Sequence, residues 1–99
     1  MKKVELGGKK RPVRFSYLCI KDICKATKLG LNQLSSLGSE IDHVGIMAYF
    51  GLKHGASKNG EEFNYKIKDI EEWLDNEDFS KLNEIFEAFQ LDQAQGEGK

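Results

Sequence analysis

The sequence predicts a mainly α-helical fold: a small domain of four to five helices with a short N-terminal β-hairpin. Apolar and charged residues alternate on both sides of a Gly-Gly pair near the N-terminus, which is typical of a hairpin. Beyond it, apolar residues recur at three- and four-residue spacing, which is typical of amphipathic helices. The 99 residues, 39% of them hydrophobic, suffice for one domain with a small core. We expect residues 1–91 to form this domain and the polar residues 92–99 to form a flexible tail.

The hairpin is predicted from a turn signal and the apolar positions around it. Gly7-Gly8 suits a two-residue hairpin turn, because glycine readily adopts the positive φ that such turns require. The alternating apolar residues on either side are Val4, Leu6, Val13 and Phe15. Pro12 has no N–H to donate, so we expect it at an edge position outside the hydrogen-bond ladder.

Four longer helices and one short helical connector are predicted after the hairpin. The helices are expected at residues 17–28, 40–54, 66–75 and 78–91, with the connector at 31–37. Ser16 is the predicted N-cap of the first helix. Ser39 begins a sequence similar to a capping box before the second. In the first helix, Tyr17 is placed on the buried face together with Ile20 and Ile23.

The helix predicted at 40–54 is apolar nearly all round. Its main stripe consists of Ile41, Val44, Ala48 and Leu52. Gly45, Gly51 and Gly55 lie along or beside that stripe, so another backbone segment can approach closely. Such a helix either lies at the centre of the core or presents apolar surface to a partner. The candidates for a partner-binding surface are Ile46, Met47, Tyr49 and Phe50.

The net charge of −1 hides an uneven distribution along the chain. Residues 1–28 hold 9 basic and 2 acidic side chains, a net of +7, and residues 29–60 hold 2 of each. Residues 61–99 hold 4 basic and 12 acidic side chains, a net of −8. The two ends therefore form surfaces of opposite sign, which can pair between the subunits of a homo-oligomer. Such pairing would weaken at high salt.

No constellation of residues indicates catalysis, a cofactor or a metal. Cys19 and Cys24 lack the second ligand pair of a zinc site. His43 and His54 lie about three helical turns apart, too far to share one ion. The acidic run within 71–78 has neither the spacing of a calcium loop nor a neighbouring nucleophile, so it is interpreted as a solvated helix face. An enzyme is therefore the function class with the least support.

The basic residues of the hairpin leave a second function open. Lys9, Lys10, Arg11 and Arg14 are predicted to form a basic surface, and a β-ribbon of this kind can follow phosphates or enter a DNA groove. Few aromatic side chains accompany them, and lysines also protect an exposed strand edge from unwanted pairing. A small nucleic-acid-binding regulator is therefore the alternative function, and nucleic acid is the less favoured partner.

The order of elements, together with several short motifs, is more informative than any single residue. A basic hairpin leads into Phe15 at the start of a helix, and Gly-Leu-Lys-His-Gly at 51–55 closes the apolar helix. Ile-Glu-Glu-Trp-Leu-Asp follows at 70–75, and the segment 79–89 ends in Ala-Phe. In these features, most of the chain resembles the tail assembly chaperones of long-tailed phages and their prophages.

The resemblance implies a non-enzymatic protein that binds the tape measure protein before the tail tube assembles around it. Such chaperones keep that long, helix-rich chain soluble during tail morphogenesis. A longer form made by programmed frameshifting is frequent in the family, and its extra domain recruits tail tube subunits. The expected location is the host cytoplasm, with no membrane partner and no place in the mature virion. The sequence agrees, since it has neither an apolar run of spanning length nor a signal-peptide core.

Overall fold

The computed structural model describes residues 2–30, 32–33 and 41–97. In this part of the chain, four helices follow a two-stranded antiparallel hairpin, so the predicted fold class is confirmed. The elements are β1 (Lys3–Leu6), β2 (Lys9–Pro12), α1 (Tyr17–Thr27), α2 (Ile41–Lys58), α3 (Ile67–Asp75) and α4 (Ser80–Glu97). Most of the predicted connector at 31–37, and Ser39 with its predicted cap, lie outside the described residues.

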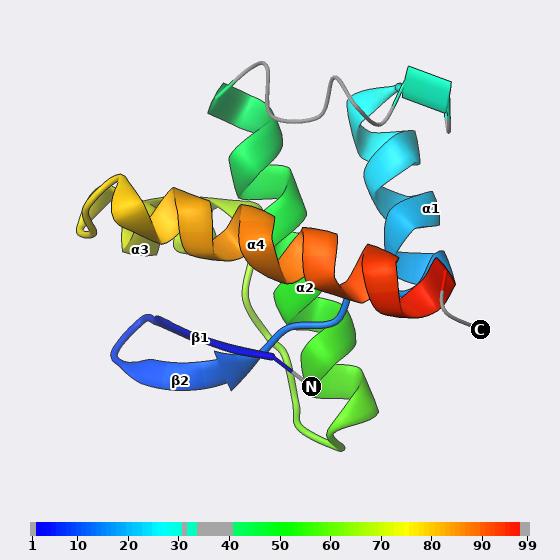
Figure 1. The fold of residues 1–99 in the computed structure, drawn as a ribbon. Coiled ribbons are helices and arrows are strands. Elements are labelled where there is room, and N and C mark those ends of the chain that lie inside the picture. The colour runs from blue at the N-terminus through cyan, green and yellow to red at the C-terminus, as the bar shows by residue number, and fades with distance from the viewer. Residues whose placement is uncertain (1, 31, 34–40, 98–99) are drawn as a thin grey trace.

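The helix α2 is the central element of the fold. It contacts α1, α3, α4 and β2, and Figure 1 shows it running through the middle of the molecule with α4 crossing over it. This central place explains why its sequence is apolar nearly all round. No helix in the described part of the chain is long and apolar enough to cross a lipid bilayer.

The hairpin has the predicted turn and register. Gly7 and Gly8 have φ values of 61° and 86°, and the strands pair from Leu6 with Lys9 outwards. The Val13 N–H donates to the Lys2 carbonyl oxygen at 2.9 Å. Since donors alternate along an antiparallel strand, the preceding Pro12 sits where no ladder hydrogen bond is required, as predicted.

The helix α1 begins at its predicted cap and buries Ile20 and Ile23 as predicted, but not Tyr17. The Ser16 Oγ accepts from the Cys19 N–H at 3.3 Å. Cys19, Ile20 and Ile23 are buried, whereas Tyr17 is 81% exposed, so its predicted burial is wrong. Tyr17 lies roughly 110° around the helix from the centre of the buried stripe.

Two glycines of α2 allow the N-terminal segment to lie against the helix backbone. A Cβ on Gly51 would come within 2.7 Å of Cζ of Phe15, and a Cβ on Gly55 would overlap the carbonyl oxygen of Pro12. The Arg14 N–H donates to the Gly51 carbonyl oxygen at 3.0 Å. The close backbone approach predicted for this helix is therefore confirmed.

The predicted stripe of α2 is buried, and the helix is longer than predicted. Val44, Ala48 and Leu52 are all buried, while the side chain of Ile41 lies outside the described residues. The helix continues to Lys58 instead of ending at residue 54. Its last turn buries Ala56 in the core, a packing gain that the polar residues around it do not reveal.

The helix α3 matches its prediction, and α4 extends beyond its predicted end. The Lys66 N–H donates to Oδ2 of Asp69 at 2.8 Å at the start of α3. The helix α4 begins at Ser80 and continues to Glu97, so residues 92–97, predicted as a flexible tail, continue the helix. Polar residues such as Gln and Glu have high helix propensity, and a polar composition therefore does not exclude helix. Residues 98–99 lie outside the described residues.

The core joins the hairpin to all four helices. Its buried residues are Val4, Leu6, Val13, Phe15, Cys19, Ile20, Ile23, Met47, Ala48, Leu52, Ile70, Ile85 and Ala88. The rings of Phe15 and Phe89 meet edge to face with their centroids 5.3 Å apart. The first and last apolar segments of the domain thus share one core.

Candidate partner-binding site

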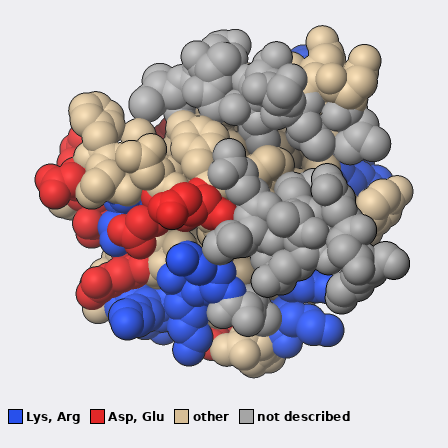
Figure 2. All heavy atoms as spheres, viewed as in Figure 1, with Lys and Arg blue, Asp and Glu red and all other residues tan. Residues whose placement is uncertain are grey.

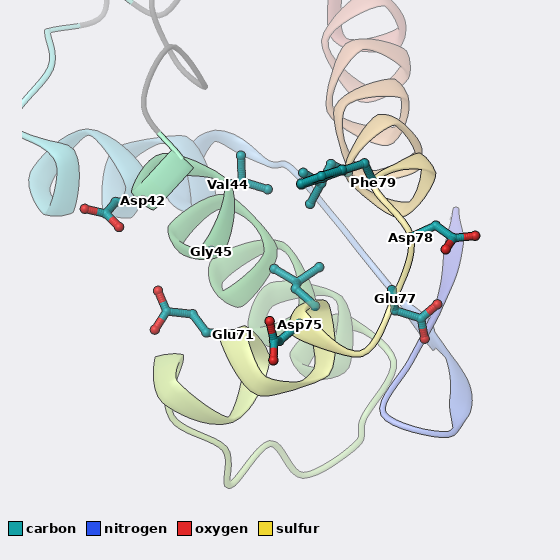
Figure 3. Close-up of a pocket in the computed structure, with 10 residues that line it drawn as sticks. Asp42, Val44, Gly45, Glu71, Asp75, Glu77, Asp78 and Phe79 are labelled. Atoms are coloured by element: carbon teal, nitrogen blue, oxygen red, sulfur yellow. The ribbon is translucent and has the colours of Figure 1, made fainter.

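A pocket of about 440 Å³ lies where three helices approach one another. The beginning of α2, the end of α3 and the segment leading into α4 form its walls. Its lining residues are Asp42, Val44, Gly45, Glu71, Leu74, Asp75, Glu77, Asp78, Phe79 and Leu82. Figure 3 shows the pocket with these ten residues as sticks.

The centre of the pocket is apolar. Val44, Leu74 and Leu82 contribute aliphatic side chains, and Gly45 lies beneath the side chain of Glu71. Phe79 stands beside Val44 in Figure 3 and is 80% exposed. A large aromatic side chain that remains exposed next to an apolar cavity is typical of a binding surface.

The rim of the pocket is acidic. Its carboxylates come from all three walls and belong to Asp42, Glu71, Asp75, Glu77 and Asp78. None of the lining residues that the structure describes is Lys or Arg. In Figure 3 the labelled carboxylates do not converge on one point: Asp42 and Glu71 lie on one side and Asp75 lies between the helices, whereas Glu77 and Asp78 lie on the other side and point away from Val44. Among the residues that the structure describes, no group of three or more His, Cys, Asp or Glu could hold a metal ion.

Acidic and basic side chains lie next to each other on one face of the molecule. Figure 2 shows acidic side chains gathered over the α3–α4 end, with basic side chains below them over the hairpin. The opposite charges found at the two ends of the sequence thus meet on one face of a single chain. An apolar pocket with one sign of charge at its rim can select partners by charge as well as by shape.

The residues predicted to bind a partner from α2 do not form one exposed surface. Met47 is fully buried, so its predicted place on a binding surface is wrong. Ile46, Tyr49 and Phe50 are each half-buried. The ring of Tyr49 packs edge to face against Phe50 and Phe63, with centroids 4.9 and 5.6 Å apart. The neighbouring elements cover most of this helix, and that covering accounts for its apolar residues.

The predicted basic surface loses one of its four members. Lys9 and Lys10 are exposed and Arg14 is half-buried, but Arg11 is buried with only 9% of its surface accessible. Arg11 pairs with Val4 across the hairpin, and cross-strand partners share a face, so Arg11 points to the core.

The guanidinium of Arg11 fastens the hairpin to α3. Its Nε donates to the Leu6 carbonyl oxygen at 2.7 Å, and its Nη2 donates to the Gly7 carbonyl oxygen at 3.2 Å. The charged carbon lies 4.2 Å from the ring centroid of Trp73 and 5.1 Å from that of Tyr65. Arg11 therefore has a structural role and is not available to a phosphate.

Sequence reasoning missed Phe79 and the role of the acidic run. The spacing of Phe79, Leu82 and Phe86 predicts that Phe79 is buried on the apolar face of α4. In the structure, however, Phe79 lies just ahead of the first helical residue, Ser80. The position of Phe79 before the start of α4 could have indicated its exposure, because residues ahead of a helix need not lie on its apolar stripe. The acidic residues of 71–78 are exposed as predicted, but several of them also form the rim of an apolar pocket.

The pocket suits the binding of a protein segment better than chemistry on a small substrate. Its carboxylates are spread around the rim, and its centre offers aliphatic and aromatic surface. No protein-family model matches this chain, and no curated protein or solved structure matches it either.

Proposed function

We propose that this protein is a non-enzymatic tail assembly chaperone of a long-tailed phage or prophage. Its proposed client is the tape measure protein, which it binds and keeps soluble during tail morphogenesis. The observation that carries the proposal is the apolar pocket with Phe79 exposed at its edge. The motif resemblance described above supplies the identity of the client.

The pocket offers what such a client requires. A long helical chain that has not yet been packed into a tail exposes apolar stripes, and these stripes need temporary cover. Burying a side chain such as Phe79 contributes on the order of 1.5–3 kcal/mol, from which the cost of ordering both partners is subtracted. One pocket therefore gives weak binding, which suits a chaperone that must release its client.

The proposal includes where the protein acts and what else it meets. We place it in the host cytoplasm during assembly and outside the finished virion. Tail tube subunits are further proposed partners through a longer form of the chain. Repeated binding along one extended client would bring many copies together, and contacts between the copies would then strengthen their attachment.

Co-expression with the tape measure protein tests the proposal. We expect that protein to be soluble and to co-purify with the wild-type chain. Phe79→Ala should lower its soluble fraction severalfold, whereas Leu18→Ala should not, because Leu18 is an exposed apolar residue of α1 outside the pocket. Tape measure protein that stays insoluble beside the wild-type chain would show that the proposal is wrong.

The nucleic-acid alternative predicts a different experiment. A regulator would bind DNA with an affinity that falls steeply with salt, and Lys9, Lys10 and Arg14 would carry the contacts. Burial of Arg11 leaves this surface with fewer charges than the sequence predicts. We therefore expect no DNA mobility shift at moderate salt, and a strong shift that Lys9→Glu abolishes would favour the regulator.

A further inference from the structure

We propose that the pocket binds an amphipathic helix whose apolar face is flanked by Lys or Arg side chains. This deepens the proposed function, on which the identity of the client rests, because it specifies which segments of a client are bound. The apolar centre would receive residues at helical spacing, and the acidic rim would contact the flanking cations.

The first argument is the uncompensated charge of the pocket. Among the described residues, its lining includes the five rim carboxylates and no basic residue. The lysine nearest to it on α4, Lys81, is buried and lies 3.2 Å from Glu84, so it is engaged within its own helix. The negative potential of the pocket attracts an approaching cation and repels an approaching carboxylate.

The second argument is the exposed apolar surface inside that field. Phe79 is 80% exposed beside the aliphatic side chains of Val44, Leu74 and Leu82. A partner with charge alone would leave this surface in water. A partner with apolar residues alone would gain nothing from the rim, so a segment that carries both fits best.

A second copy of this chain fits the pocket less well than such a segment. Its hairpin offers the exposed cations Lys9 and Lys10, but its apolar residues Val4 and Leu6 are buried in its own core. Docking of the hairpin would therefore supply charge without an apolar face. A helical client that has not yet been packed into a tail offers both an apolar face and flanking cations.

Binding of two matched synthetic helices tests the proposal. Each peptide has about 18 residues, or five turns, with the same leucine stripe; one carries Lys beside the stripe and the other Glu. Fluorescence anisotropy with the full chain should show the Lys peptide binding at least about tenfold more tightly than the Glu peptide. This preference should shrink at about 0.5 M salt, where charges are screened within a few ångströms.

Variants in the pocket make the test specific. Phe79→Ala should weaken binding of the Lys peptide about tenfold. Glu77→Lys combined with Asp78→Lys should reduce or reverse the preference between the peptides. The matched controls are Leu18→Ala and Glu62→Lys, which change an exposed apolar and an exposed acidic residue outside the pocket. Unchanged helicity by circular dichroism establishes that each variant is folded.

Each outcome decides the proposal. Equal binding of both peptides, binding of neither, or equal effects of pocket and control variants would overturn it. Self-association that the pocket variants abolish, without peptide binding, would assign the pocket to a second copy and also overturn it. If the Lys peptide binds but tape measure protein stays insoluble, the proposed function fails and this inference stands. If Phe79→Ala lowers the soluble fraction of that protein but the double variant of Glu77 and Asp78 does not, the inference fails and the function stands.

Discussion

Replacing Gly55 by alanine is expected to lower the free energy of unfolding by about 3 kcal/mol. The new Cβ would overlap the carbonyl oxygen of Pro12 and lie 2.9 Å from Cα of Val13. Both neighbours are backbone, and Val13 is a core residue, so relief requires a shift of the hairpin away from α2. The gain in helix propensity, at most about 1 kcal/mol, does not offset this cost.

Gly45→Ala in the same helix is the matched control. Its Cβ would meet Cγ of Glu71 at 3.2 Å, but that side chain is exposed and can rotate away. We expect stability equal to or slightly above that of the wild type. Thermal and urea unfolding measure both variants, and the Gly55 variant should melt more than about 10 °C lower. Equal stability of the two variants would mean that the hairpin does not lie on this part of α2.

Arg11→Ala is expected to lower the free energy of unfolding by about 2–4 kcal/mol. The substitution leaves the Leu6 carbonyl without its guanidinium donor and removes the cation between the rings of Tyr65 and Trp73. It also removes the packing of the long side chain stem. Arg11→Lys should recover only part of the loss, because an ammonium lacks the planar fork that serves both carbonyls and rings.

Lys10→Ala is the matched control for this substitution. Lys10 is adjacent in β2, faces the other side of the hairpin and is exposed, so its removal should change stability by less than about 0.5 kcal/mol. Urea unfolding gives the free energies. Trp73 is the only tryptophan of the chain, so its fluorescence emission reports the environment of Arg11 directly. Similar stability and emission in both variants would show that Arg11 does not fasten the hairpin.

The positions of the elements could be predicted from the sequence because their signals are local. Gly7-Gly8 is a turn by conformational preference alone, and Ser16 caps α1 with its own hydroxyl. The burial of a residue is harder to predict from the sequence than the position of an element, since burial depends on which other element covers that face. Tyr17 and Met47 were misplaced for this reason: each is apolar, and only the packing of its helix decides whether it is covered.

Arg11 could have been placed from the sequence, unlike the pocket. Counting outwards from the Gly7-Gly8 turn pairs Arg11 with Val4, and that pairing assigns both to the core face. The pocket, in contrast, is lined both by Asp42, near the start of α2, and by Phe79, just before α4. No periodicity within either helix encodes this arrangement, because it depends on how the helices cross.

The fastening of the hairpin by Arg11 also sets an order for folding on the ribosome. The hairpin is synthesised before its partner Trp73, which lies in α3, and α4 follows later still. An isolated two-stranded hairpin is marginally stable in water, and its apolar residues Val4 and Leu6 are covered only within the joint core. The apolar face of the hairpin is therefore covered completely only after both α3 and α4 have been synthesised.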